Sequence, residues 1–478
     1  MIKKISVVIG VSVGAFFYAQ DVSVIKNTSE VYGNNYNIGS AKYTAMGGSM
    51  GALGGDISVL NTNPAGLGVF ITGGAQGTLV ITNNKNTSTL AGKSIDYTAN
   101  STDLGQVGGV LSFQNNGNTP WKFVNIGINY TNIKAGNYVR TSGNANIKEP
   151  YPDAIAPTDY NVYSGHMYDR VGNHSKMNLG VGGNYDNKVY VGASFNFSSA
   201  NFDQSDDIRI ASQNDPTKNA VFHKQNTPYG EVSNGFSMAL GVIGKLSNQI
   251  RLGAAIETPT WWTIDRGYTY YQSNATGVTS TIYNESRKLS TPTKLTLSGA
   301  FVPNKKFAVN IDYRVDLGKP SFSGGDAEIQ LNDFYKSTYQ AQSEIRLGAE
   351  YRLDQFRLRG GYAFTNSPFR DYKYNEVKSG DFKYGGVFND DGSISTSGTL
   401  KNYIVSDSKI VSGGIGYDFK SFFVDAAYQY ATYTYTNPFF AGVYATVAAN
   451  DGINEGTSVV SNVKNTRGNI ILTAGWKF

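Results

Sequence analysis

The sequence contains no cysteine, so disulfide bonds and thiolate-bound metals are excluded. Proline is scarce, at 13 of 478 residues, and tryptophan occurs only 4 times. Beyond the N-terminus no apolar run approaches the ~20 residues that a membrane-spanning helix needs. Mean hydropathy is slightly negative, at −0.31. These absences together exclude a disulfide-stapled domain and a helical membrane protein.

The charge balance is mild, with 41 basic and 36 acidic side chains and a formal net charge of +5. Nucleic-acid binding would require a run or a stripe of Lys and Arg, and the sequence has neither. We therefore expect no nucleic-acid partner.

The first residues have the layout of an export signal. Lys3 and Lys4 form a basic start, residues 5–18 are apolar but too short to span a membrane comfortably, and Ala19 suits the position before a cleavage site. We assign 1–20 to a signal peptide that is removed during export. An uncleaved membrane anchor is the alternative.

From residue 71 onward, apolar and polar side chains alternate with a period of two. In 176–185 the apolar Met177, Leu179 and Val181 alternate with Asn and Gly, and the Asp-Asn pair that follows at 186–187 favours a tight turn into 188–199. The pattern predicts about fourteen strands, each near the length of a tilted membrane-spanning strand. They are 71–82, 103–114, 121–132, 175–186, 188–199, 234–247, 249–258, 293–303, 306–317, 343–353, 355–365, 408–418, 421–431 and 467–478.

Short turns alternate with long polar connections along this series. The long connections are 83–102, 133–174, 200–233, 259–292, 318–342, 366–407 and 432–466. Outer-membrane barrels have short periplasmic turns and long extracellular loops. The fold class predicted for 71–478 is therefore all-β, a transmembrane antiparallel β-barrel, with both termini in the periplasm because the strand number is even.

The predicted strands 343–353 and 355–365 show which side chains face inward. We expect apolar residues to face lipid, because a charge there costs ~2–4 kcal/mol near the membrane centre. The inward set is Glu344, Arg346, Glu350, Arg352, Arg357 and Arg359. We interpret these charges as cross-strand pairs that hold the wall in register, in preference to a direct role in transport.

Residues 21–70 do not alternate and are rich in small residues. The run from Gly39 to Asp56 is dense in Gly and Ala, and Asp56 or Ser58 is placed to cap a short helix that ends at Asn63-Pro64. Because small residues permit close packing and Gly permits unusual turns, this segment fits a plug inside the barrel.

A resemblance to a known family rests on this segment. The run Gly-Ser-Ala-x-Tyr-x-Ala-Met-Gly-Gly-x-Met-Gly-Ala-Leu-Gly-Gly-Asp, followed by Asn63-Pro64-Ala65-Gly66, resembles the hatch of the FadL/TodX-type outer-membrane transporters, particularly their Bacteroidetes branch. Weaker matches are Thr291-Pro292 with Asp312-Tyr313, Arg346-Leu347-Gly348-Ala349-Glu350-Tyr351, Arg359-Gly360-Gly361-Tyr362 and Gly414-Ile415-Gly416-Tyr417.

The resemblance implies a fourteen-stranded barrel with an N-terminal hatch in the lumen. It implies passive uptake of hydrophobic compounds, either long-chain fatty acids or aromatic hydrocarbons, with exit sideways into the membrane. By position, Asn63, Pro64, Ala65 and Gly66 are the hatch residues expected to contact the ligand. The expected partners are a hydrophobic small molecule and outer-membrane lipid, and a monomer without cofactor is expected.

Aromatic residues mark two further features. Trp261 and Trp262 open the long connection 259–292, and two interpretations stay open for them: contact with an apolar ligand, or membership of the interfacial aromatic belt. The final strand places apolar residues on one face and ends at Phe478, like the C-terminal signal that the barrel-assembly machinery reads.

Catalytic and metal motifs are weak. Gly47-Gly48-Ser49-Met50-Gly51 matches the nucleophile-elbow pattern, but the histidines, at 166, 174 and 223, lie in predicted outer loops away from it. Those histidines lack the close spacing of metal ligands, and the acidic run at 389–392 is better explained as a turn. We expect neither enzyme activity nor a bound metal. The alternative functions are a general porin for small hydrophilic solutes and a surface adhesion or structural barrel.

Overall fold

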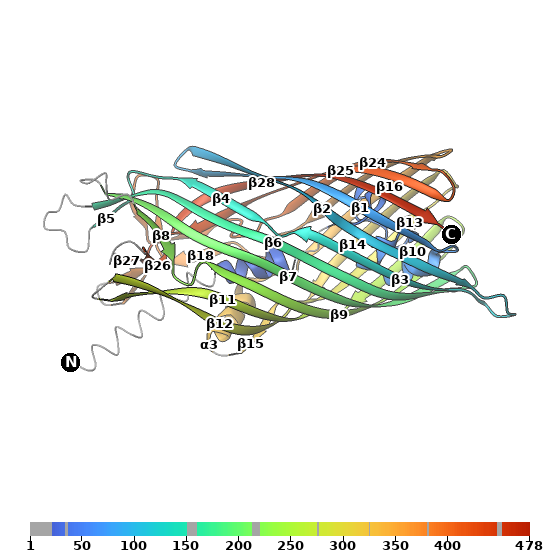
Figure 1. The fold of residues 1–478 in the computed structure, drawn as a ribbon, viewed down its shortest axis with the longest axis horizontal. Helices are drawn as coiled ribbons and strands as arrows, with labels where there is room; N and C mark the ends of the chain where they lie inside the picture. The colour runs from blue at the N-terminus through green and yellow to red at the C-terminus, as the bar shows by residue number, and fades with distance from the viewer. Residues whose placement is uncertain are drawn as a thin grey trace.

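The computed structural model describes residues 22–33, 37–150, 160–212, 220–274, 277–324, 326–379, 382–446 and 452–478. Within them, fourteen antiparallel strands form a closed barrel that is long along its axis (Figure 1). The wall strands are β1 (Gly74–Leu90), β2 (Lys93–Gln114), β3 (Trp121–Lys134), β6 (Tyr160–Tyr185), β7 (Val189–Ser212), β9 (Tyr229–Lys245), β10 (Ile250–Glu257), β13 (Thr293–Phe301), β14 (Phe307–Leu317), β16 (Ser343–Leu353), β17 (Phe356–Thr365), β24 (Ser408–Asp418), β25 (Phe422–Phe439) and β28 (Val459–Lys477). Strand β1 pairs with β28 and closes the barrel. The predicted fold class is confirmed.

The short turns predicted from the sequence lie at one end of the barrel, the end that carries the C-terminus in Figure 1. Asp186, Asn187, Asp354 and Lys420 in these turns have positive φ angles. Asn and Asp accept this conformation more readily than other non-glycine residues, so the turn chemistry of the sequence sets the register of each hairpin. We call this end the turn end and the opposite one the loop end.

Several strands continue well beyond their predicted limits toward the loop end. The prediction of a long loop at 83–102 was wrong, because β1 and β2 remain paired up to a two-residue turn at Ala91 and Gly92. The hairpin of β6 and β7 likewise runs from Tyr185 and Val189 out to Asn161 and Ser212. These extensions carry Asn, Ser and Thr on both faces, so no apolar alternation marks them.

The remaining predicted loops contain secondary structure of their own. The additional strands are β4 (Asn137–Ser142), β5 (Lys148–Pro150), β8 (Ala220–Lys224), β11 (Trp261–Asn274), β12 (Gly277–Ser290), β15 (Ser321–Ser323), β18 (Tyr372–Asn375), β19 (Val377–Ser379), β20 (Phe382–Tyr384), β21 (Val387–Phe388), β22 (Ile394–Ser395), β23 (Ser397–Leu400), β26 (Gly442–Ala445) and β27 (Gly452–Glu455). Connection 318–342 contains the helix α3 (Asp326–Thr338), which we did not predict. The buried Leu331, Tyr335 and Tyr339 follow its helical period.

The wall is apolar outside and polar inside. On β16, Ile345 and Leu347 are 45% and 46% exposed, whereas Glu344 and Arg346 are 2% and 3% exposed. This inversion is expected where hydrocarbon surrounds the barrel. None of the described helices is long and apolar enough to cross a membrane.

Inward charges form the expected cross-strand pairs. Arg314 faces Glu344 across β14 and β16, at 3.0 Å between guanidinium and carboxylate. Arg359 faces Glu350 across β16 and β17, at 2.8 Å. Arg346 joins the same Glu344 at 2.6 Å.

Residues 37–70, which we call the hatch, cross the inside of the barrel as three short helices. These are α2 (Ala41–Ala45) and the 3-10 helices η2 (Ile57–Asn61) and η3 (Pro64–Val69). The Asp56 carboxylate accepts from the Ser58 backbone N–H at 2.8 Å and caps η2, as predicted. The Asn63 side chain accepts from the Ala65 N–H at 3.0 Å and caps η3, whose first residue is Pro64.

Inward-facing glycines on several wall strands allow the hatch to pack closely against the wall. A Cβ atom on Gly361 of β17 would lie 2.8 Å from the Ala45 carbonyl oxygen, and one on Gly253 of β10 would lie 2.9 Å from that of Gly51. The same applies to Gly182, Gly192 and Gly348, whereas Cβ atoms on Gly241 and Gly414 would meet the hatch side chains of Asn63 and Ala45. Hatch backbone therefore packs directly on wall backbone, an approach that a side chain would prevent.

Polar side chains of the wall bind the hatch backbone as well. The Asp312 carboxylate accepts from the backbone N–H groups of Met50, at 3.0 Å, and Gly51, at 3.2 Å. The Asn125 side chain donates to the carbonyls of Leu67 and Phe70, at 2.6 and 2.9 Å. The hatch is thus attached to wall strands on different sides of the lumen.

Two adjacent glycines on β17 test this packing. Gly361→Val should lower the free energy of unfolding by about 2 kcal/mol, because the added side chain overlaps the hatch backbone. A Cβ atom on Gly360 would have no neighbouring atom within 4 Å, so Gly360→Val is the matched control. Urea titration in detergent micelles measures both, and equal stabilities would contradict the proposed fit of hatch to wall.

Candidate functional site

The largest apolar cluster of the interior lies on the loop-end side of the hatch. We call it the aromatic cluster. Its buried members are Val24, Ile25, Val31, Tyr32, Ala135, Ala200, Phe202, Tyr229, Trp262, Ile264, Leu289, Phe322, Leu331, Tyr335, Tyr339, Phe369, Tyr403 and Ile404. They come from the wall, from the β11–β12 hairpin, from α3 and from the N-terminal segment. Segments far apart in sequence therefore close the lumen with apolar side chains.

The N-terminal segment enters this cluster as a helix. Residues 22–27 are α-helical and continue into the π-helix η1 (Thr28–Tyr32), and together they form what we call the N-terminal helix. The Tyr32 ring meets Trp262 edge to face, with ring centroids 5.0 Å apart. The Tyr32 hydroxyl donates to Glu231 of β9 at 2.8 Å.

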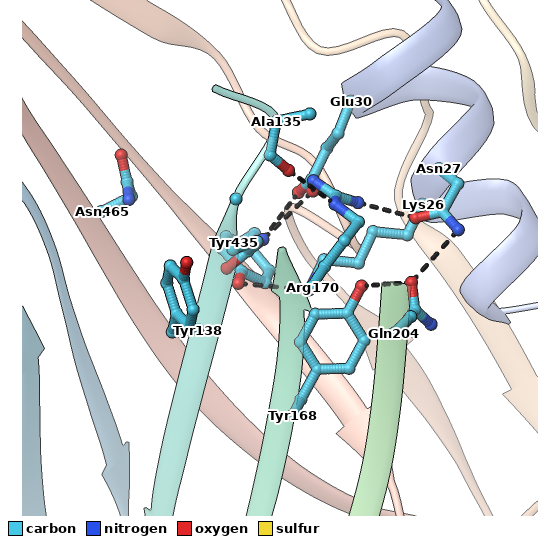
Figure 2. A network of polar contacts seen from close by, with 12 residues as sticks. Lys26, Asn27, Glu30, Ala135, Tyr138, Tyr168, Arg170, Gln204, Tyr435 and Asn465 are labelled. Carbon is cyan, nitrogen blue, oxygen red and sulfur yellow. Dashed lines mark hydrogen bonds and ion pairs between the residues drawn. The ribbon is translucent and has the colours of Figure 1, made fainter. Parts of the chain in front are cut away.

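A buried polar network fixes the other side of the N-terminal helix (Figure 2). Arg170 of β6 contacts the Glu30 carboxylate at 2.7 Å and donates to the Asn27 side-chain oxygen at 2.6 Å. Its Nε donates to the Ala135 carbonyl at 2.8 Å. Gln204 of β7 accepts from Asn27 at 3.1 Å. Sequence reasoning missed this network, although Lys26 and Glu30 are conspicuous as charges in a sparingly charged segment.

Lys26 belongs to the same network and lies between two tyrosines. Its Nζ is 4.4 Å from the Tyr168 ring centre and 4.7 Å from that of Tyr435, and it donates to the Tyr435 hydroxyl at 3.3 Å. Burial lowers the pKa of Lys26 to about 8, and nearby Glu30 partly opposes this. The N-terminal helix is therefore held by side-chain contacts that can break while the backbone ladder of the wall stays intact.

The two predicted tryptophans lie on opposite faces of β11. Trp262 is 2% exposed and packs in the aromatic cluster against Gly235, whose Cβ would lie 2.7 Å from the indole ring. Trp261 is 47% exposed on the outside, where it stacks with Phe236 at 6.3 Å between ring centroids. The alternation of the strand thus separates two neighbours that the sequence could not tell apart.

The predicted hatch residues, 63–66, lie farther along the barrel axis than the aromatic cluster, toward the turn end. Asn63 donates to the carbonyls of Gly51 and Val242, at 2.8 and 3.3 Å, and Pro64, Ala65 and Gly66 are buried. This turn packs against Gly192 of β7 and Gly241 of β9. Gly241 is six residues along β9 from the glycine under Trp262, which corresponds to about 20 Å at ~3.3 Å per residue. The two predicted sets of site residues are not in contact.

Charged side chains occupy the lumen between these two layers. Lys176 of β6 and Glu257 of β10 form an ion pair at 2.8 Å, and Ser237 of β9 donates to the same carboxylate at 2.8 Å. Ser237 stands between the glycine positions 235 and 241 along β9. An apolar molecule moving from the aromatic cluster straight along the axis would meet this layer first.

A cavity of about 310 Å³, lined by both apolar and charged side chains, opens between hatch and wall at the turn end. Its charged lining residues are Lys42, Asp56, Glu350, Arg352, Arg357, Arg359, Asp418, Asp425 and Lys477. Arg359 bridges Glu350 and Asp425, at 2.8 and 2.6 Å. The lumen is therefore charged at this mouth as well.

The loops form a second apolar core beyond the aromatic cluster, which we call the loop core. It consists of Leu90, Ile147, Tyr163, Ile208, Ile210, Phe222, Phe439, Phe440, Tyr444, Ile453 and Val459. Strands β8 and β26, from different loops, pair at its edge. The loop core thus covers the barrel at its loop end.

The histidines are placed differently from the prediction. His166 and His174 lie on β6 and are buried, so the interpretation as exposed loop residues was wrong for both. His166 contacts Asp206 at 3.0 Å and stacks on Phe439 at 4.1 Å between ring centroids. The described residues contain no cluster of three or more potential metal ligands. Ser49 is buried in the hatch, where its hydroxyl donates to the Asn310 carbonyl at 3.0 Å.

No protein-family model matches the chain, and no curated protein matches it in sequence. Among solved structures, the chain is similar to the toluene transporter TodX of P. putida, with a TM-score of 0.51 at 13% identity over 92% of this chain and 98% of that one. It is similar to the TodX deltaS2S3 mutant, described as a monoaromatic hydrocarbon channel, with a TM-score of 0.53 at 12% identity over 92% and 99% of the two chains. At these identities the likeness shows a shared barrel fold.

The network in Figure 2 predicts how the N-terminal helix responds to loss of one partner. Glu30→Ala removes the carboxylate at Arg170, and breaking a buried ion pair in this way costs about 3 kcal/mol. The chain has no native cysteine, so Val24→Cys provides a single buried thiol on the helix. We expect maleimide to label this thiol about a hundredfold faster in the Glu30→Ala background, since ~1.4 kcal/mol corresponds to tenfold. An unchanged rate would show that the network does not hold the helix.

Proposed function

We propose that this protein is an outer-membrane transporter that takes up hydrophobic compounds passively. The observation that carries the proposal is the buried aromatic cluster, which fills the lumen above a hatch attached to the wall. A pore for hydrophilic solutes needs a polar, water-filled lumen, whereas an aromatic cluster suits apolar cargo. The toluene transport named for the structurally similar TodX supports the same class of cargo.

The driving force is transfer of apolar surface out of water. Burial is favourable by about 25 cal/mol per Å², so an aromatic molecule of roughly 150–200 Å² gains on the order of 4–5 kcal/mol before entropic costs. The same effect favours its onward transfer to the hydrocarbon of the membrane. No energy source is needed, because concentration and apolar burial set the direction.

We infer that the cargo leaves sideways through the wall. Hatch backbone packs on wall glycines, and both the layer around Lys176 and Glu257 and the cavity at the turn end are charged. These features favour the membrane over the periplasm as the destination of an apolar molecule. In this proposal Asn63, Pro64, Ala65 and Gly66 fix the edge of the hatch that borders the route.

The membrane orientation follows the general rule for outer-membrane barrels. We infer that the turn end is periplasmic and the loop end extracellular. The start of β1, at Gly74, and the C-terminal Phe478 then both lie on the periplasmic side, where Phe478 is available to the barrel-assembly machinery. We expect the protein to act as a monomer without a cofactor, with outer-membrane lipid as its surroundings.

Trp261 and Trp262 provide a matched test of the ligand route. Trp262→Ala should lower the uptake rate of labelled toluene about tenfold, because it removes an aromatic contact worth ~0.5–1.5 kcal/mol beyond its buried area. Trp261→Ala should leave uptake near wild type, because that ring lies outside the barrel. The assay uses cells that carry the protein in a lipopolysaccharide-covered outer membrane, with a labelled long-chain fatty acid run in parallel to distinguish the cargo class.

Assembly must be checked in the same cells. Heat-modifiable gel mobility reports whether each variant forms the barrel, and Trp262→Phe keeps an aromatic ring if the alanine variant assembles poorly. Equal effects of the Trp261 and Trp262 substitutions on assembled protein would contradict a ligand route through the aromatic cluster.

A separate measurement addresses the general-porin alternative. Liposomes containing the purified protein should swell slowly in small sugars, because the aromatic cluster and the hatch leave no room for hydrated solutes. Deleting residues 21–70 should increase swelling several-fold by emptying the lumen. Fast swelling of wild-type liposomes, unchanged by the deletion, would favour a porin instead.

A further inference from the structure

The wall strands reach different heights at the loop end. Strands β6 and β7 pair out to Asn161 and Ser212, but β16 and β17 pair only as far as Glu344 and Thr365. Strands β14 and β16 likewise pair only up to Val315 and Ser343. In this sector, other elements must separate the aromatic cluster from the outside.

The helix α3 is the main element in this gap. Leu331, Tyr335 and Tyr339 are buried members of the aromatic cluster, one turn apart along the helix. Asp333 and Lys336 on its other side are exposed. Figure 1 shows α3 beside β15 and below the β11–β12 hairpin in that view. One amphipathic helix therefore stands between apolar side chains and solvent.

Among the described residues, backbone bonds attach α3 only at its C-terminal end, where the Arg370 N–H donates to the Thr338 carbonyl at 3.0 Å, and side-chain contacts attach the rest of the helix. The Asn332 side chain donates to the Phe322 carbonyl and accepts from the Phe322 N–H, at 2.9 and 2.8 Å. Glu328 contacts Arg287 of β12 at 3.7 Å. Each such bond contributes about 0.5–1.5 kcal/mol, so the polar contacts that hold the N-terminal part of the helix are few and individually weak. Opening the wall between two paired strands would instead break a run of backbone bonds.

The two ends of α3 are attached unequally. At the C-terminal end the Tyr339 hydroxyl donates to Asp316 of β14 at 2.9 Å, and Tyr339 forms an isolated bridge with Phe369. At the N-terminal end the helix follows the three-residue strand β15, which pairs with β12 only from Ser321 to Ser323. This arrangement allows the N-terminal end to swing outward while Tyr339 stays in place.

Entry along the barrel axis is more obstructed than entry past α3. The loop core packs apolar residues from several loops, and β8 pairs with β26 at its edge. Buried polar contacts reinforce this cover, with Asp206 between His166 at 3.0 Å and Lys224 at 3.6 Å. A molecule that arrives along the axis would have to separate this core.

We propose that α3 is the gate through which hydrophobic cargo enters the aromatic cluster from the side. This rests on the proposed transport function and adds the entry point to it. Moving α3 away from Phe322 and Arg287 opens the cluster on the flank of the loop end, and its return buries the cargo among aromatic rings. The loop core stays closed throughout.

The absence of native cysteine allows the α3 gate to be held closed by a specific cross-link. Arg287→Cys with Glu328→Cys places one thiol on β12 and one on α3, and a bis-methanethiosulfonate reagent bridges them through disulfides that a reductant cleaves. The matched control is His223→Cys with Ala445→Cys, which bridges the paired strands β8 and β26 and locks the loop core. Uptake of labelled toluene is measured before bridging, after bridging and after reduction.

We expect the bridge on α3 to lower uptake at least tenfold and the reductant to restore it, while the bridge on the loop core leaves uptake unchanged. Uptake that survives the α3 bridge overturns the proposal. Uptake stopped by the loop-core bridge also overturns it, since the cargo would then enter along the axis. The transport function itself fails separately, if wild-type protein gives no uptake above that of cells without it.

Discussion

The structure depends on direct contact between two backbones, that of the hatch and that of the wall. Gly361 and Gly253 let hatch carbonyls approach strands on different sides of the lumen, and Asp312 binds hatch N–H groups from between them. A side chain at either glycine would separate the surfaces by more than the contact allows. Because the hatch is held in this way, a molecule that moved along the whole barrel axis would have to disrupt this packing.

Polarity changes along the lumen in layers. The aromatic cluster lies toward the loop end, the Lys176–Glu257 layer follows, and the hatch and the charged turn-end cavity complete the series. An apolar molecule is stabilised in the first layer and disfavoured in the others, since a charged group gives up hydration when apolar matter displaces its water. This order is the basis of the proposed sideways release into a membrane.

The elements of the interior are attached by different kinds of contact. The wall is a closed ladder of backbone hydrogen bonds, whereas the N-terminal helix is fixed by side chains such as Glu30 and Arg170, and α3 by side chains such as Asn332. Elements held by a few side-chain bonds open at lower free energy than a strand inside a ladder. The two helices that border the aromatic cluster are therefore the parts of the interior best suited to move.

The sequence alone determined the barrel, its turn end and the inward direction of Glu344 and Arg346, because a period of two fixes which face each residue occupies. It also indicated the hatch, through a small-residue segment that does not alternate and that resembles the hatch of a known transporter family. Only the tertiary structure decided that Trp262 is interior and Trp261 exterior, that Glu30 meets Arg170, and that α3 covers a low sector of wall. Those outcomes depend on which distant segments meet inside the closed cylinder, and local periodicity carries no information about contacts across its lumen.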